Sequence, residues 1–216
     1  MRQLRVLAVA GPVLFTLDWM LLGWSHVGYR PDRETISSLS AHGAPGWPVM
    51  VAGQVALVVA FLAVATLCVR VLGRPGIGPA GLYGLAAVGT VQASAFRTIC
   101  TQVDAGWCTP MPRSAFPHQQ WAHGIGTAMP FASLPLACLV VAWVTRRVDG
   151  LRDVAVLALA VLVVALPSVL WFLTQGTDWH GLSEKLFLTS LAAFTGYLGL
   201  RLGGCAAGEL ERVGCD

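Results

Sequence analysis

The sequence predicts an all-α integral membrane protein, a bundle of six transmembrane helices with its N- and C-termini in the cytoplasm. Of its 216 residues, 56% are hydrophobic and only 12% are charged. The mean hydropathy of +0.67 is far above that of an ordinary soluble domain. The chain also contains several apolar runs of about 20 residues, the length that a helix needs to cross about 30 Å of hydrocarbon.

Six apolar segments meet this length, and their connections are too short for a separate soluble domain. We expect one transmembrane domain over residues 1–204 and a short cytoplasmic tail over residues 205–216. The predicted spans are residues 5–27, 47–72, 78–100, 117–145, 153–175 and 182–203. The first has the basic start and apolar run of a signal peptide, but Asp18 interrupts it and no small-x-small cleavage site follows. We interpret it as a retained helix.

The basic residues predict the orientation, because Lys and Arg near short loops stay on the cytoplasmic side. With the N-terminus inside, nine arginines are cytoplasmic, and Arg30, Arg33, Arg97, Arg113 and Lys185 are external. The net charge of +3 is then a signal of topology, and nothing supports a nucleic-acid partner.

Two cysteines, Cys100 and Cys108, flank the external loop CTQVDAGWC. An oxidising compartment would permit a disulfide there, while two free thiols at helix ends are an equally ordinary interpretation. The sequence has no C-x-x-C motif, which argues against a redox-active thiol enzyme.

Asp18 is the most informative residue within a predicted span. A carboxylate at membrane depth costs about 3 kcal/mol even on the lenient insertion scale, so it needs a partner or a proton. A hydrogen bond to Gln54 or Gln92 is one interpretation, and a protonated acid or a ligand contact in a cavity is the other. Arg97 is either its counter-ion or a side chain that reaches to the interface.

The charges of the segment YRPDRETISSLSAHG, residues 29–43, are expected at the outer rim of the bundle. Pro31 could begin a short interfacial helix in which Ile36 and Leu39 form an apolar stripe, and a solvated loop is the alternative. The loops after the first, third and fifth spans share this side. The segment therefore shares a face of the bundle with Asp104, Arg113, His118, His123, Asp178, His180 and Glu184.

The histidines do not predict a metal site. His118 and His123 are five positions apart, which separates them by about 140° on a helix. His180 and Glu184 could share a face, but the carboxylate can pair with Lys185 instead. Most tryptophans fall toward the outer half, where they form either a lipid-facing belt or the walls of a cavity that stabilises positive charge.

Several segments resemble a bacterial membrane family known as domain of unknown function 998. They are YRPDRETISSLSAHG, VDAGWC, HQQWAHGIG and GLSEKLF. The family is similar in having six helices and a P-x-R-x-x-I-S-x-L segment in its first external loop, matched here by Pro31, Arg33, Ile36, Ser37 and Leu39. The resemblance implies the fold and the polar rim over nearly the whole chain, and it implies no reaction.

Other membrane enzyme classes lack their hallmarks here. A lipid phosphatase needs clustered basic residues and histidines for phosphate, whereas this chain has a single lysine. An enzyme that ionises prenyl diphosphates with magnesium needs an aspartate-rich motif, and none is present.

The leading hypothesis is therefore a membrane enzyme that uses metal-free acid–base chemistry, without a cofactor, on an apolar lipid or isoprenoid substrate. Its most concrete form is a terpene-cyclase-like, proton-initiated cyclisation or isomerisation, because a buried carboxylic acid keeps its proton and can act as a general acid. The candidate catalytic residues are Asp18, Glu34, Asp104, His118 and His123. The candidate substrate-binding residues are Trp24, Arg33, Arg97, Trp107, Trp121 and Glu184.

A non-enzymatic membrane protein that binds a lipid or a partner protein is the alternative hypothesis. Under it, the external charges hold the loops together and recruit the partner. A transporter is less favoured, since no two broken helices occupy matching positions. The oligomeric state and the substrate are not predicted.

Overall fold

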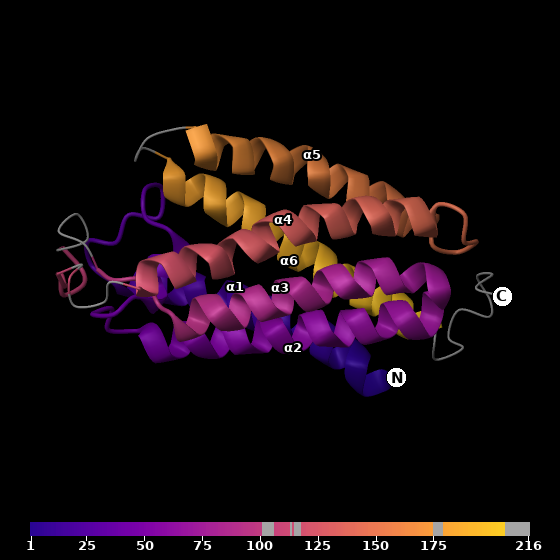
Figure 1. Cartoon of the computed structure of the whole chain (residues 1–216), viewed down its shortest axis with the longest axis horizontal. Helices are drawn as coiled ribbons and strands as arrows, with labels where there is room; N and C mark the ends of the chain where they lie inside the picture. Colours follow the sequence, from indigo (N-terminus) through magenta and orange to yellow (C-terminus); the bar gives the residue numbers. More distant parts are fainter. Residues whose placement is uncertain (101–105, 113, 115–117, 175–178, 206–216) are drawn as a thin grey trace.

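The computed structural model describes residues 1–100, 106–112, 114, 118–174 and 179–205, and it confirms the all-α prediction. Six long helices run side by side along the molecule (Figure 1). In chain order the elements are α1 (Arg2–Ser25), η1 (Ile36–Ser40), α2 (Trp47–Leu72), η2 (Arg74–Gly76), α3 (Ile77–Ala95), α4 (Gln119–Thr145), α5 (Arg152–Thr174) and α6 (His180–Cys205).

Five of these helices, α1, α2, α4, α5 and α6, are long and apolar enough to cross a membrane by length and composition. The chain is thus a multi-pass membrane protein. Helix α3 has 19 residues and contains four glycines and Gln92, which lower its hydropathy. It ends at Ala95, five residues before the predicted end of the third span. The residues that follow are not helical and pair with the first loop, where the N–H of His42 donates to Thr98 O at 2.8 Å.

Small residues let the helices approach closely, because no Cβ keeps their backbones apart. A Cβ at Gly89 of α3 would overlap the backbone of Gly126 on α4. Gly199 and Gly203 of α6, the small-x-x-x-small pair of the last helix, lie against Ala8 and Arg5 of α1. The core of the bundle is therefore built on close helix pairs, with α5 placed outside, against α4 and α6 (Figure 1).

The two ends of the bundle differ in chemistry. We call the end at the left of Figure 1 the cap end, where residues 26–46, 96–100 and 106–112 form a cap over the helices. We call the opposite end, with the N-terminus and the α4–α5 connection, the arginine end. Among the described residues it carries eight arginines: Arg2, Arg5, Arg70, Arg74, Arg146, Arg147, Arg152 and Arg201.

The only helix in the first loop is η1, a short 3-10 helix that begins at Ile36 rather than at Pro31. Residues 30–34 form a turn instead, in which the N–H groups of Arg33 and Glu34 donate to Arg30 O. Ile36 and Leu39 are both buried, so the predicted apolar stripe points into the bundle. It contributes to a continuous hydrophobic core.

Candidate functional site

A cavity lies inside the bundle beneath the cap. Helices α1, α2, α3, α4 and α6 surround it and η1 closes one end, while the described residues of α5 lie outside its lining. The space that the centre of a water-sized sphere can reach is about 70 Å³. Because one water needs about 10–15 Å³ on this measure, the cavity has room for a few waters or one small branched apolar group.

The walls of the cavity are largely apolar. Phe15 of α1, Phe61 of α2 and Phe131 of α4 contribute aromatic rings. Phe131 also stacks on Phe187 of α6, with ring centroids 4.4 Å apart. Electron-rich ring faces of this kind can stabilise positive charge in a dry site.

Glu184 is the acidic residue of the lining. It lies in the first turns of α6, is only 3% exposed, and its Oε2 accepts the backbone N–H of Ile36 at 2.5 Å. A carboxyl group this deep must be hydrogen-bonded or neutral, since burying an isolated charge is very costly. Its contact with the cap supplies one such hydrogen bond.

Lys185, the next residue, is 6% exposed and reaches the same part of the cap. Its Nζ donates to Glu34 O at 2.5 Å. Gly181 lies against the backbone of Glu34, where a Cβ would overlap it. We call Gly181, Glu184 and Lys185 the α6 clamp, because all three hold the segment from Glu34 to Ile36 on the start of α6.

His123 of α4 supplies a second titratable group to the cavity. Its Nδ1 lies 3.1 Å from both Ala93 O and Phe96 O at the end of α3. Carbonyl oxygens only accept hydrogen bonds, so Nδ1 carries a proton and Nε2 of the neutral ring is an acceptor. The end of α3 therefore fixes the tautomer of this histidine.

Gln54 of α2 and Thr90 of α3 add polar atoms to the lining. The Ser94 hydroxyl, which has one proton to give, lies 2.8 Å from Gln54 Oε1 and 2.7 Å from Thr90 O. Ser37 of η1 completes the polar part of the site. Polar atoms on an otherwise apolar wall can orient a ligand.

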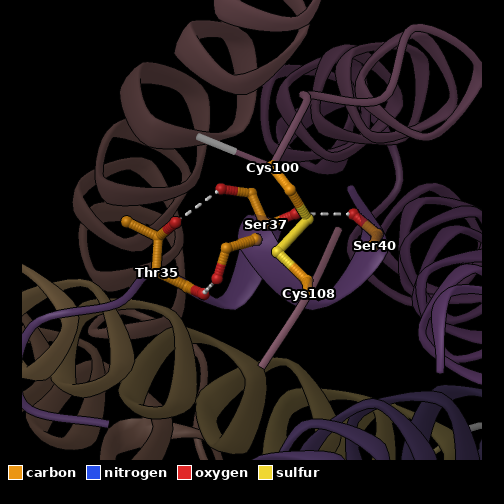
Figure 2. Close-up of a disulfide and its surroundings, with 6 residues drawn as sticks. Thr35, Ser37, Ser40, Cys100 and Cys108 are labelled. Carbon is orange, nitrogen blue, oxygen red and sulfur yellow. Dashed lines mark hydrogen bonds between the residues drawn. A yellow bond between two sulfur atoms is a disulfide. The ribbon is translucent and has the colours of Figure 1, made fainter. Parts of the chain in front are cut away.

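The cap that closes the cavity is cross-linked. Cys100 and Cys108 form a disulfide with their Cα atoms 6.2 Å apart, and Figure 2 shows it among the hydroxyl groups of Thr35, Ser37 and Ser40. The N–H of Cys100 donates to His42 O at 3.1 Å. The disulfide loop is thus hydrogen-bonded to the segment that follows η1.

Trp107 anchors the other side of the disulfide loop. It is 8% exposed, and its ring meets His26 and Tyr29 edge-on, with centroids 5.7 and 5.3 Å away. The Tyr29 hydroxyl in turn donates to Glu34 O or Thr35 O, each 3.3 Å away. The candidate substrate-binding residue Trp107 is therefore part of the cap.

The structure brings together two of the predicted site residues, His123 and Glu184, as lining of one cavity. Glu34 lies at the edge of the site, with its carboxylate accepting the N–H of Arg30 at 3.1 Å. Asp18 faces Gly53 of α2 instead. Asp104 lies outside the described residues.

The remaining predicted residues lie at the surface or in the cap. Trp24 and Trp121 are 89% and 79% exposed, and His118 is exposed where α4 begins. Arg33 is near Asp32, with 3.9 Å between Nε and Oδ2. Arg97 lies over the ring of Trp47 at 3.8 Å from its centroid, and its Nη2 donates to His42 Nδ1 at 3.1 Å.

Sequence reasoning missed Ser37, Thr90 and the phenylalanine walls as parts of the site. One signal was available on α2, where Gln54, Leu57 and Phe61 follow the i, i+3, i+7 spacing of a single helix face. Within the described residues, no three His, Cys, Asp or Glu side chains are grouped so that they could hold a metal ion.

The fold and the site together define a multi-pass helical membrane protein with a capped internal cavity. The family model described as "Protein of unknown function (DUF998)" matches residues 9–201. The chain belongs to this family, as its four quoted segments indicated. Comparison with curated proteins and with solved structures finds no match.

Proposed function

We propose that this protein spans the cell membrane six times, with both termini in the cytoplasm and the cap outside. Two observations support this topology. The start of α1 and the end of α6 both lie at the arginine end (Figure 1), as an even number of crossings would place them, so we count α3 as a span beside the five more apolar helices. The eight arginines at that end outnumber the four cations of the cap end, Arg30, Arg33, Arg97 and Lys185, among the described residues.

Within this topology, the proposed function is that of an enzyme acting on an apolar lipid or isoprenoid substrate by metal-free proton transfer. One observation carries the proposal: a buried carboxyl group and an imidazole of fixed tautomer line the same apolar cavity. A general acid and a general base facing one substrate is the arrangement that proton-initiated isomerisation requires.

In this mechanism Glu184 is neutral and donates its proton to one carbon of a carbon–carbon double bond. The O–H bond of the acid breaks, a C–H bond forms, and the other alkene carbon becomes a cation next to the phenylalanine rings. Nε2 of His123 then removes a proton from a neighbouring carbon, which leaves an isomer of the substrate. A second double bond that attacks the cation first would give a ring.

The size of the cavity suits one branched end of a longer chain. A terminal isoprene-like unit could occupy the space between Phe15, Phe61 and Phe131, with the rest of the chain between the helices in the bilayer. The sequence had indicated Asp18, Glu34 and Asp104 as candidate acids and Glu184 as a substrate-binding residue. In this proposal Asp18 stabilises the α1–α2 contact and Glu34 stabilises the cap.

A second candidate function, lipid binding without catalysis, is favoured by the α6 clamp. Glu184 and Lys185 both hydrogen-bond the backbone of residues 34–36, which is what a purely structural pair would do. Under this alternative the cavity holds part of a lipid and the cap presents it to a partner protein.

The decisive experiment compares lipid extracts from host cells that make the intact protein, Glu184→Gln or His123→Asn, each supplied with farnesylated and geranylgeranylated compounds. For an enzyme we expect a species of unchanged mass and shifted retention with the intact protein, and its loss in both variants at equal abundance in membranes. Glu34→Gln is the matched control, because its carboxylate contacts Arg30 instead of the cavity. Identical extracts from all four would leave lipid binding as the function.

A further inference from the structure

A groove between α4 and α5 opens on the lipid-facing surface at the arginine end. It encloses about 450 Å³ on the measure used for the cavity. Its floor is apolar, and several of its side chains are exposed: Leu139 by 48%, Val156 by 69% and Leu159 by 52%. These side chains belong to helices that are apolar enough to span the membrane, so acyl chains are their natural neighbours.

The mouth of this groove is basic. Arg146 and Arg152 line it beside Trp143, and the guanidinium of Arg146 lies 3.5 Å from the centre of the Trp143 ring. Arg152 has one weak ion pair, 3.6 Å from Asp149, between two side chains that are 77% and 84% exposed. In the part of the chain that the structure describes, Arg146 has no ion pair.

Trp143 and the two arginines indicate how deep in the membrane the mouth of the groove lies. Trp side chains favour the boundary between hydrocarbon and headgroups, and arginines beyond it meet lipid phosphates. The groove thus continues from the headgroup level into the hydrocarbon. From the mouth inward the groove presents arginine, then indole, then aliphatic side chains. This order matches the phosphate, the interfacial region and the acyl chain of a phospholipid.

We propose that the α4–α5 groove binds an anionic phospholipid of the leaflet at the arginine end. Arg146 and Arg152 hold the phosphate, and one acyl chain lies along Leu139, Val156 and Leu159. Charge complementarity selects this occupant over a second copy of the chain, since two such mouths facing each other would oppose like charges. The proposal is independent of the chemistry in the cavity.

The test measures lipid retained on the purified full chain by native mass spectrometry, after equal additions of phosphatidylglycerol or phosphatidylcholine. We expect phosphatidylglycerol to be preferred about tenfold, and this preference to vanish in Arg146→Gln/Arg152→Gln because the charges at the mouth are gone. Arg70→Gln/Arg74→Gln is the matched control. It removes two exposed arginines at the same end, outside the groove, and should keep the preference.

A second variant, Val156→Trp, fills the floor without changing the charge. Because Val156 is exposed, the fold should tolerate it, and phosphatidylglycerol binding should still fall. Equal retention of the two lipids by the intact protein would overturn the proposal. So would a preference that survives in both groove variants, or a dimer that depends on Arg146 and Arg152.

Discussion

The carboxyl group of Glu184 accepts the backbone N–H of Ile36 across 148 positions of sequence. One hydrogen bond thus joins the start of the last helix to the cap, over a cavity that both residues line. The same Glu184 carboxyl group is the acid of the proposed chemistry, so in that proposal one side chain has both a structural and a catalytic role. Substitutions at this point can separate the two roles.

Replacing Glu184 with Gln should preserve the fold, because the amide oxygen can still accept the Ile36 N–H. Replacing it with Ala should lower the free energy of unfolding by about 1–3 kcal/mol, the cost of leaving a buried donor unsatisfied. Thermal unfolding of the purified protein in detergent measures both. Equal destabilisation by Gln and Ala would show that charge, and not the hydrogen bond, holds the cap.

Gly181→Ala should detach the cap from α6. The added Cβ would overlap the Glu34 backbone, and an overpacked contact of this kind costs about 1–3 kcal/mol. Hydrogen exchange of the amides in residues 34–40 should accelerate. Gly124→Ala in α4 is the control, since nothing lies within 4 Å of its Cβ position. A variant Gly181→Ala with unchanged exchange would contradict the clamp.

Removing the disulfide by Cys100→Ser/Cys108→Ser should lower the free energy of unfolding by about 2–3 kcal/mol, from the entropy of closing a short loop in the unfolded chain. A reductant added to the intact protein should have the same effect. Cys205→Ser, which removes a cysteine outside this disulfide in the last turn of α6, is the control and should keep the parent's stability and its response to reductant, whereas the disulfide-free variant should no longer respond. Reduction without loss of thermal stability would show that the cap is held by its other contacts alone.

Stability should fall as the pH drops below about 6.5, and His42 should contribute to the fall. Burial, and then the charge of Arg97, hold the pKa of His42 below its usual value, against a hydrogen bond with Gln119 that raises it. Below the unfolded-state pKa the unfolded chain binds more protons than the folded one, so acid favours unfolding until the folded pKa is passed.

His42→Asn should flatten this acid slope in a series of thermal unfolding curves, because its amide can still accept from Arg97 but does not titrate. Arg97→Gln should flatten it in part, by removing the second cause of the lowered pKa. An acid slope as steep in His42→Asn as in the parent would assign the effect to another group.

The helices were predictable because each is a long apolar run bounded by Gly, Pro or charge, a purely local signal. The early end of α3 was not predictable, since Thr98 and Cys100 form backbone hydrogen bonds with His42, a partner far away in sequence. The short helix begins at Ile36 and not at Pro31 for a similar reason. The N–H of Ile36 donates to Glu184 and not to the preceding turn.

The candidate site was predictable in part. Loop placement brought His123 and Glu184 to the same rim, but no local pattern distinguishes them from His118, which lies at the surface. Asp18 drew attention because a charge within a span is costly. The cavity itself depends on how five helices and η1 meet, and that cannot be read from any one segment.

The α6 clamp also sets an order for biosynthesis. At about 5–20 residues per second, Ile36 is made on the order of ten seconds before Glu184, its partner 148 positions later. Cys100 and Cys108, only eight positions apart, can be joined well before that. The disulfide of the cap can therefore form while α6 is still being synthesised. The hydrogen bonds from Glu184 and Lys185 to residues 34–36 form only after α6 has entered the bilayer.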